Sequence, residues 1–325
     1  MSDDYRIIVR ATGGPDVLER EAVGALSAGP DEAVVRHTAI GLNFIDTYYR
    51  AGAYPLPLPT GLGSEAAGVV EAVGQGVTGF KPGDRVAYAS APIGAYATIR
   101  TVPAAHLVAL PNAIDDRTAA AVMLKGMTAD FLVGECGRVA AGQTVLIHAA
   151  AGGVGSLLVP WIKALGATVI AHVGSPDKAE RVRRLGADYV LCCAFEDLAS
   201  EVRAIRPQGV DLVLDSVGKA SLPASIACAG RRGLVVSYGN ASGAPDPVAP
   251  ATLQKAGSVF LTRPTMFDYV DTRERLEAAA TRLFARIADG TLKVQVGQTF
   301  PLSDVAKAHW ALEGRKTIGS TVLIP

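Results

Sequence analysis

Two hydrophobic patterns divide the chain near residue 120. Before that point, short apolar runs such as Ala33–Val35 and Val69–Val73 are interrupted by glycine and proline. This pattern predicts a series of β-strands joined by turns. Three prolines and three glycines between Ala51 and Gly63 predict a rigid loop that cannot join a sheet and rims a cleft.

Beyond residue 120, apolar strands alternate with helices. We expect a helix over Asp116–Cys136, capped by Asp115 or Asp116. Further helices are expected at Ser156–Leu165 and Asp177–Leu185, with strands at Thr144–His148, Thr168–Val173, Tyr189–Cys192, Asp211–Asp215 and Gly233–Tyr238. Strands alternating with helices at this spacing predict a doubly wound parallel sheet.

The C-terminal part returns toward the first pattern, with a helix expected at Thr272–Ala288 and short strands at Phe300 and Gly319–Ile324. We expect it to fold back onto the β-rich segment. The predicted fold is therefore α/β, with one domain formed by residues 1–124 and 265–325 and a second by residues 125–264.

A glycine-rich turn follows the first strand of the alternating region, where Val145–Gly155 reads Val-Leu-Ile-His-Ala-Ala-Ala-Gly-Gly-Val-Gly. A dinucleotide needs a tight turn, a backbone without Cβ atoms near its pyrophosphate, and a helix whose first N–H groups face the phosphates. Placed between a strand and a helix, this turn predicts a dinucleotide site at Gly152, Gly153 and Val154.

The next strand indicates which nucleotide is bound. NAD-specific folds place an acidic residue at the end of this strand to hold the ribose 2′-OH. Here Thr168–Val173 is followed by Gly174 and Ser175, which leave room for a 2′-phosphate, and Lys178 supplies a positive charge. The pattern favours NADPH.

Composition narrows the function classes. The 325 residues contain 31 basic and 31 acidic side chains, and this zero net charge argues against tight nucleic-acid binding. The acidic N-terminus lacks an apolar run and predicts no secretory signal. Apolar Val145–Ile162 contains three glycines and Pro160, so we expect no membrane span. Four cysteines without a C-x-x-C pair are typical of a reducing cytoplasm.

A zinc dehydrogenase is the first catalytic alternative. The segment Gly63–Val77 matches the zinc signature except that Ser64 replaces the metal-binding His, and the upstream Cys is replaced around Asn43. Serine is no substitute for imidazole or thiolate, so we expect no catalytic metal. The chain also lacks the G-x-S-x-G turn of serine hydrolases and the H-E-x-x-H metal motif.

Seven motifs together resemble the quinone oxidoreductase family, the zeta-crystallin-like, zinc-free branch of the medium-chain dehydrogenase/reductases. They are Asn43–Arg50, Gly61–Gly68, Leu124–Thr128, His148–Gly155, Asp215–Gly218, Arg232–Asn240 and Thr262–Pro264. The resemblance implies a GroES-like β-rich catalytic domain and a Rossmann NADPH-binding domain. It also implies a homodimer that pairs edge strands near Ser258–Thr262.

The same resemblance assigns residues to the site. Substrate positioning, without a classical acid or base, would fall to Asn43, Tyr48, Tyr54 and Arg263. The cofactor would be held by Asn43, Tyr48, Thr128, Gly152, Gly153, Val154, Gly174, Ser175, Lys178, Cys193, Ser216, Tyr238, Asn240 and Arg315. Two residues depart from the family pattern: Cys193 stands where an aromatic residue is usual, and Pro160 stands where a Gln is usual.

The function that follows is metal-free hydride transfer from NADPH to a quinone, a substrate electrophilic enough to need no Lewis acid. The alternative within the same chemistry is reduction of activated C=C bonds in enones or alkenals. A third hypothesis, from another class, is a crystallin-like or RNA-binding protein that retains NADPH binding.

Overall fold

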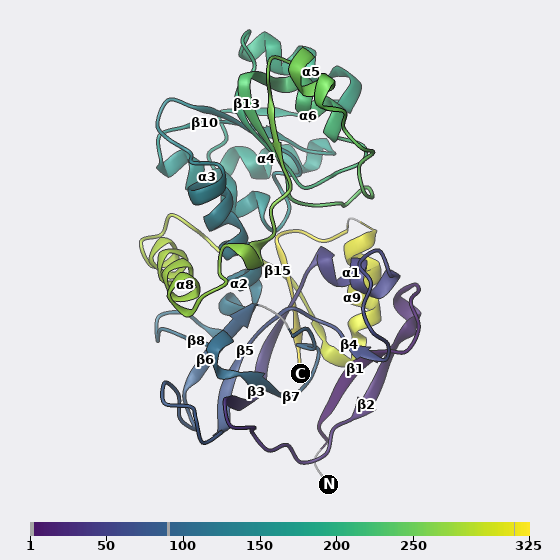
Figure 1. Cartoon of the computed structure of the whole chain (residues 1–325), viewed down its shortest axis with the longest axis vertical. Coiled ribbons are helices and arrows are strands. Elements are labelled where there is room, and N and C mark those ends of the chain that lie inside the picture. Colours follow the sequence, from purple (N-terminus) through teal and green to yellow (C-terminus); the bar gives the residue numbers. More distant parts are fainter. Residues whose placement is uncertain (1–2, 90–91, 315) are drawn as a thin grey trace. The chain divides into compact units, whose positions relative to one another are not determined.

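The computed structural model describes residues 3–89, 92–314 and 316–325, and Figure 1 traces them in colour from the N- to the C-terminus. The chain divides into two compact units. Unit 1 comprises Met1–Met127, Val270–Phe284 and Val294–Pro325, and unit 2 comprises Thr128–Tyr269 and Ala285–Lys293. Each unit contains its own sheet and its own hydrophobic core.

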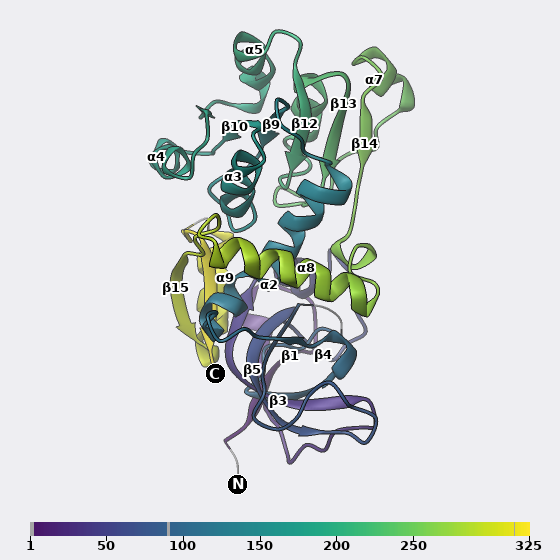
Figure 2. The ribbon, with the colours of Figure 1, turned by 90° about the vertical axis from the view of Figure 1, so that its left-hand side faces the viewer.

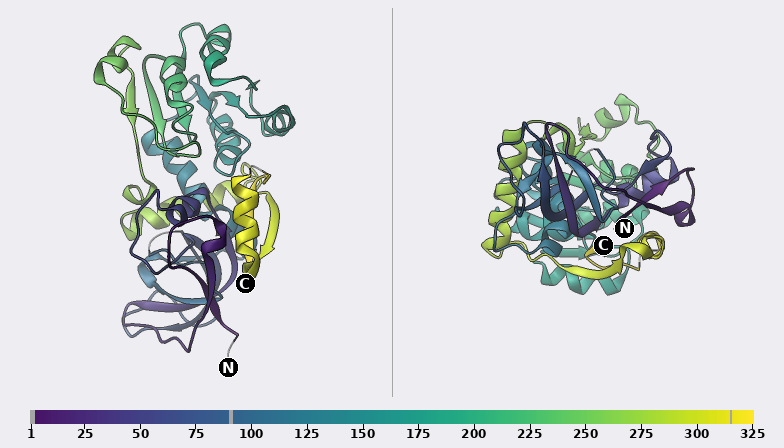
Figure 3. Two further views of the ribbon diagram at one scale, coloured as in Figure 1. Left: turned by 90° about the vertical axis from the view of Figure 1, so that its right-hand side faces the viewer. Right: turned by 90° about the horizontal axis from the view of Figure 1, so that it is seen from below.

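Unit 1 is built on a seven-stranded sheet in the order β15-β16-β3-β5-β6-β8, with β7 paired to β3. All neighbours are antiparallel except β15 and β16. The C-terminal strand β16 lies beside β3, so the chain does fold back onto its first segment (Figure 3). The strands are β3 (Glu32–Leu42), β5 (Glu65–Val73), β6 (Arg85–Ala89), β7 (Ile99–Pro103), β8 (Val108–Ala109), β15 (Val296–Pro301) and β16 (Ser320–Ile324).

A smaller sheet of unit 1 has the order β2-β1-β4, formed by Leu18–Ala22, Tyr5–Val9 and Thr60–Gly61. The expectation that residues 51–63 cannot join a sheet is wrong, because Gly61 pairs with Ile8 and Thr60 with Val9. The pairing uses residues that follow the last proline of the loop and keep their N–H donors.

Unit 1 also contains α1 (Phe44–Ala51) and α9 (Val305–Glu313), neither of which the sequence pattern predicted. The eight residues of α1 are rich in aromatic and β-branched side chains, which have modest helix propensity and resemble a strand. Two longer helices, α2 (Asp116–Phe131) and α8 (Arg273–Ala288), were expected. A π-helical turn extends α2 to Cys136, and Asp115 caps it by accepting the Thr118 N–H at 2.9 Å.

Unit 2 has the expected doubly wound parallel sheet, in the order β11-β10-β9-β12-β13-β14 (Figure 2). Its strands are β9 (Thr144–Ile147), β10 (Thr168–His172), β11 (Tyr189–Leu191), β12 (Val210–Asp215), β13 (Ala229–Ser237) and β14 (Phe260–Thr262). Its helices are α3 (Gly155–Ala164), α4 (Pro176–Arg184), α5 (Phe195–Ile205), α6 (Leu222–Cys228) and α7 (Pro250–Lys255). The central strands are apolar because helices cover them, and Leu146 and Val213 are fully buried.

The strand order of unit 2 reverses direction at β9. Strand β10 lies on one side of β9 and β12 on the other, which makes the end of β9 the topological switch point where open α/β sheets bind ligands. Strand β14 is an outer strand of this sheet, and its Phe260 has 62% of its surface exposed. Within the described residues, no helix is both long and apolar enough to cross a membrane.

Candidate functional site

Asn43 directly precedes α1, and a buried carboxylate holds its backbone. The Asn43 N–H donates to Asp46 Oδ2 at 2.9 Å. The same carboxylate accepts the Tyr96 hydroxyl at 2.8 Å and the Ser64 hydroxyl at 3.0 Å. Burial raises the pKa of Asp46 to about 6, and the hydrogen bonds from these donors oppose that increase.

A chain of hydrogen bonds continues from Asp46 through unit 1. Arg50 donates to His309 Nδ1 at 2.9 Å, so the neutral imidazole carries its hydrogen on Nε2 and donates it to the Tyr96 oxygen at 3.1 Å. Burial lowers the pKa of His309 to about 3. Arg50 also forms an ion pair with Glu313 at 2.7 Å. Each donor direction along this chain is fixed, which makes Asp46 an acceptor for Asn43.

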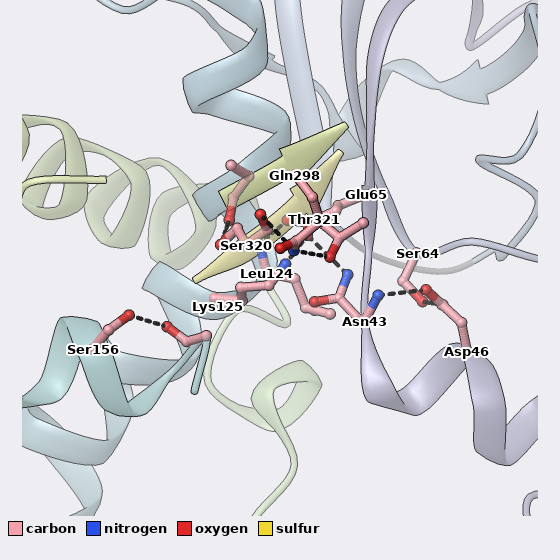
Figure 4. Close-up of polar contacts among 12 residues, drawn as sticks. Asn43, Asp46, Ser64, Glu65, Leu124, Lys125, Ser156, Gln298, Ser320 and Thr321 are labelled. Carbon is pink, nitrogen blue, oxygen red and sulfur yellow. Dashed lines mark hydrogen bonds and ion pairs between the residues drawn. The ribbon is translucent and has the colours of Figure 1, made fainter. Parts of the chain in front are cut away.

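A second buried carboxylate holds the Asn43 side chain (Figure 4). Asn43 Nδ2 donates to Glu65 Oε1 at 2.8 Å, and Lys125 Nζ lies 2.7 Å from the same oxygen. The other oxygen of Glu65 accepts the Leu124 N–H at 2.6 Å. Glu65 is fully buried and only 8% of the Lys125 side chain is exposed. Asn43 is therefore fixed at its backbone and at its amide by different carboxylates.

Ser64 stands where the zinc signature has its metal-binding His, and its hydroxyl is used as a hydrogen-bond donor to Asp46. Within the described residues, no group of three or more His, Cys, Asp or Glu side chains could hold a metal ion.

Tyr48 and Tyr54 lie together on α1 and the loop after it. Their rings meet edge to face with centroids 5.3 Å apart, and the Tyr54 N–H donates to the Tyr48 carbonyl at 3.2 Å. The structure thus brings Tyr48 and Tyr54 into contact, and Asn43 lies just before the same helix. The fourth residue predicted to position a substrate, Arg263, belongs to unit 2, where it donates to the Ser237 carbonyl at 2.7 Å.

The glycine turn of unit 2 follows β9, as the sequence predicts. A Cβ on Gly155 would lie 2.5 Å from the Ala149 carbonyl oxygen, so the turn packs too closely for a side chain there. A Cβ on Gly152 would meet only that same oxygen, at 3.1 Å. Within the described part of the chain, the N–H groups of Gly153, Val154 and Gly155 have no hydrogen-bond partner. Open N–H groups at a helix start form an anion-binding cradle.

Other predicted cofactor residues follow the carboxyl ends of neighbouring parallel strands. Gly174, Ser175 and Lys178 come after β10, Ser216 comes after β12, and Tyr238 and Asn240 come after β13. The Tyr238 side chain is hydrogen-bonded to Ser216, and burial raises the pKa of its hydroxyl. Thr128 lies on α2. Arg315 is outside the described residues.

Cys193 and Pro160, the two departures from the family pattern, both lie in unit 2. The Cys193 side chain packs partly buried against the core, and its carbonyl accepts a hydrogen bond from His172 at 3.0 Å. Helix α3 continues through Pro160.

His148, in the same unit, is fully buried. Its Nε2 lies 2.9 Å from the Ser225 hydroxyl oxygen, and burial lowers its pKa to about 4.

Sequence reasoning missed Glu65, which binds the Asn43 amide, and the residues that support Glu65 and Asp46. They are Arg50, Glu65, Tyr96, Lys125 and His309. Glu65 lies in the motif Gly61–Gly68 and Lys125 in the motif Leu124–Thr128. A charged residue among the apolar residues of each motif was the available signal that it has a buried partner. The sequence carries no such signal for Tyr96 and His309, because these hydrogen-bonded residues are 213 positions apart in the chain.

Comparison with known proteins agrees with this architecture. A family model described as alcohol dehydrogenase GroES-like domain matches residues 29–112, and one described as zinc-binding dehydrogenase matches residues 185–323. The chain is 48% identical to a quinone oxidoreductase of Pseudomonas aeruginosa over 322 residues, covering 98% of this chain and 99% of the relative. The chain belongs to the quinone oxidoreductase family. It is an oxidoreductase of the medium-chain dehydrogenase/reductase superfamily.

Two further members of this group bear on substrate and cofactor. The chain is 44% identical to a 2-haloacrylate reductase of a Burkholderia species over 98% of both chains. It is 43% identical to the crystallised Escherichia coli quinone oxidoreductase complexed with NADPH. That match has a TM-score of 0.96 and covers 99% of this chain and 100% of the other.

Four buried histidines, His37, His148, His172 and His309, predict that the protein loses stability in acid. Burial lowers the pKa of His37 and His309 to about 3 and that of His148 to about 4. The unfolded chain binds these protons near pH 6.5, so stability is full above that pH and is lost as the pH falls toward 4. The raised pKa of Asp46 acts oppositely, since its contribution is lost as pH rises from 3.8 to about 6, and it offsets one histidine. We expect the urea-derived free energy of unfolding to fall between pH 6.5 and 4.5.

His37→Asn supplies the control. His37 Nδ1 lies 2.7 Å from the Ala97 carbonyl, and an Asn amide can donate there without titrating. This variant should be less stable overall, with a pH slope shallower by about 1.4 kcal/mol per pH unit. A wild-type stability that stays flat or rises on acidification would contradict the prediction.

Proposed function

We propose that this oxidoreductase transfers a hydride from NADPH to a quinone. The observation that carries the proposal is the glycine turn at the switch point of the parallel sheet, where the N–H groups of Gly153, Val154 and Gly155 have no hydrogen-bond partner among the described residues. The chain's similarity to quinone oxidoreductases along its whole length supports the reaction class. NADPH supplies the hydride, and the protein supplies position and exclusion of water.

The residues after β10 support NADPH over NADH. No acidic side chain stands at the end of β10 to accept the ribose 2′-OH. Ser175 is the N-cap residue of α4 and Lys178 lies in its first turn, so a 2′-phosphate here would meet both a helix N-terminus and an ammonium group. The likeness to a structure complexed with NADPH agrees with this choice.

The proposal assigns residues 1–124 and 265–325 to the catalytic domain and residues 125–264 to the cofactor domain. Asn43 and Tyr48 would contact the cofactor, and Tyr48, Tyr54 and Arg263 would border the substrate. The remaining cofactor contacts are proposed at Thr128, Gly152, Gly153, Val154, Gly174, Ser175, Lys178, Cys193, Ser216, Tyr238, Asn240 and Arg315. The chemistry needs no metal ligand from the chain, because a quinone is already a strong electrophile.

We also propose a cytoplasmic homodimer. The exposed β14 offers unpaired backbone groups and the apolar Phe260 side chain at the edge of unit 2. An edge strand of this kind pairs readily with a second copy of itself.

Reduction of activated C=C bonds is a second candidate function. The similarity to a 2-haloacrylate reductase is almost as high as that to the quinone oxidoreductases. An alkene conjugated to a carboxylate or carbonyl also accepts hydride without a Lewis acid when it is sufficiently electron-poor. The two candidate functions would use the same cofactor and would differ only in the substrate that the pocket accepts.

The assay that tests the proposal follows NADPH and NADH oxidation with 1,4-benzoquinone, 9,10-phenanthrenequinone, a 2-alkenal and 2-chloroacrylate, before and after exhaustive chelation. We expect the highest kcat/KM with NADPH and a quinone, unchanged by the chelator. Preference for 2-chloroacrylate or the alkenal would favour the second candidate. Loss of activity on chelation would contradict metal-free transfer.

Lys178→Met tests the choice of nucleotide. Removal of the charge should lower kcat/KM for NADPH by about tenfold, equivalent to ~1.4 kcal/mol, while the value for NADH changes little. Lys255→Met, on α7 of the same unit, makes the same change of charge away from the turn and should affect neither. An equal loss with both nucleotides would show that Lys178 does not read the 2′-phosphate.

Alanine substitutions in the glycine turn should separate binding from folding. Gly152→Ala adds a methyl group where the pyrophosphate is expected and should raise the NADPH Kd at least about tenfold with little loss of stability. Gly155→Ala places its methyl against the Ala149 carbonyl and should cost about 1–3 kcal/mol of stability. Gly134→Ala, where a Cβ would meet nothing within 4 Å, is the control. Unchanged NADPH affinity in Gly152→Ala would place the nucleotide elsewhere.

A further inference from the structure

A buried ion pair lies directly behind Asn43 in unit 1. Lys125 Nζ and Glu65 Oε1 are 2.7 Å apart, and both side chains are almost completely shielded from solvent. Removing two charges from water costs as much as their attraction returns, so a buried pair is a weak source of stability. Its presence beside a predicted site residue calls for a role other than stability.

The fold leaves space for this carboxylate. Gly41 on β3 is opposite Glu65 on β5 in the antiparallel register. A Cβ at position 41 would overlap both Glu65 Oε1 and the Ala120 carbonyl oxygen. The Leu124 N–H at 2.6 Å then fixes the second carboxylate oxygen against α2. Glu65 is thus held rigidly by β5, β3 and α2 together.

This rigid carboxylate determines the orientation of the Asn43 amide. Its nitrogen donates to Glu65 Oε1 at 2.8 Å. A flipped amide would bring Asn43 Oδ1 to the same distance from a carboxylate oxygen, where two acceptors repel. In its ion pair with Lys125, the Glu65 carboxylate has no hydrogen to offer a flipped amide. The Asn43 backbone cannot turn to compensate, because Asp46 holds its N–H.

We propose that Glu65 and Lys125 are positioning residues that lock Asn43 with its amide oxygen available as the acceptor for a ligand hydroxyl. The inference rests on the proposed function, in which Asn43 contacts NADPH, and it specifies the group recognised: a ribose hydroxyl donates its hydrogen to Asn43 Oδ1. An amide free to flip would offer N–H groups in half of the molecules and would bind that hydroxyl more weakly.

The test uses the full-length double variant Glu65→Gln/Lys125→Met. It removes both charges at nearly constant volume, so neither charge is left buried alone. The introduced glutamine can turn its own NH₂ toward Asn43 and stabilise the flipped amide. We expect the NADPH Kd to rise about tenfold or more and kcat/KM to fall in parallel. Ser320→Ala is the matched control, because it removes a buried hydrogen bond to the Ala121 carbonyl of the same helix and leaves Asn43 untouched.

Asparagine-selective ¹⁵N labelling reads the amide directly. The chain contains three asparagines, Asn43, Asn112 and Asn240, so the Asn43 side-chain signals can be assigned from their loss in Asn43→Ala. In the nucleotide-free protein we expect one strongly shifted, slowly exchanging amide proton, which is retained in Ser320→Ala and lost in the double variant. A merely structural ion pair would lower the melting temperature without moving these signals or the Kd relative to the control.

The outcomes separate the two proposals. Unchanged Asn43 signals in the double variant overturn the positioning role whatever the ligand is. Changed signals with unchanged NADPH affinity overturn the link to ribose recognition. Wild-type protein that binds no NADPH refutes the proposed function, and in that case changed Asn43 signals still support Glu65 and Lys125 as positioning residues.

Discussion

Two buried carboxylates hold one asparagine, and the geometry of unit 1 around Asn43 depends on this constraint. Asp46 binds the backbone N–H of Asn43, and Glu65 binds its amide nitrogen. A carboxylate in a fully buried position is costly unless it is paired and hydrogen-bonded. The surrounding polar residues of unit 1 meet that requirement, with Tyr96 and Ser64 on Asp46 and Lys125 on Glu65.

Unit 2 depends on a different kind of constraint, which acts through the backbone. Parallel strands end at a common edge, so short segments distant in sequence gather there through the path of the main chain. The turn at Gly152–Gly155 packs closely against Ala149, and within the described residues its Gly153, Val154 and Gly155 N–H groups have no hydrogen-bond partner. The polar groups around Asn43 in unit 1 are thus held by side-chain hydrogen bonds, whereas the glycine turn of unit 2 is shaped by the path of the main chain.

This difference explains what could be predicted from sequence. The parallel sheet and glycine turn were predictable because apolar runs and glycines encode them locally. The α1 helix was missed because its aromatic and β-branched residues resemble a strand, while the Asp46 carboxylate that accepts the Asn43 N–H stabilises the start of the helix. The pairing of Tyr96 with His309 was unpredictable, since no local pattern links residues so far apart. Glu65 and Lys125 were visible in motifs, but their partnership appears only when β5 and α2 are packed together.

The donor set around Ser64 bears on the class of substrate. In the zinc signature the residue at this position binds the metal, whereas Ser64 turns its hydroxyl to Asp46. Serine hydroxyl and asparagine amide groups are poor ligands for Zn²⁺. Such donors are suited to hydrogen bonds with a substrate. The proposed substrates fit this donor set, because quinones and electron-poor alkenes are themselves electrophilic.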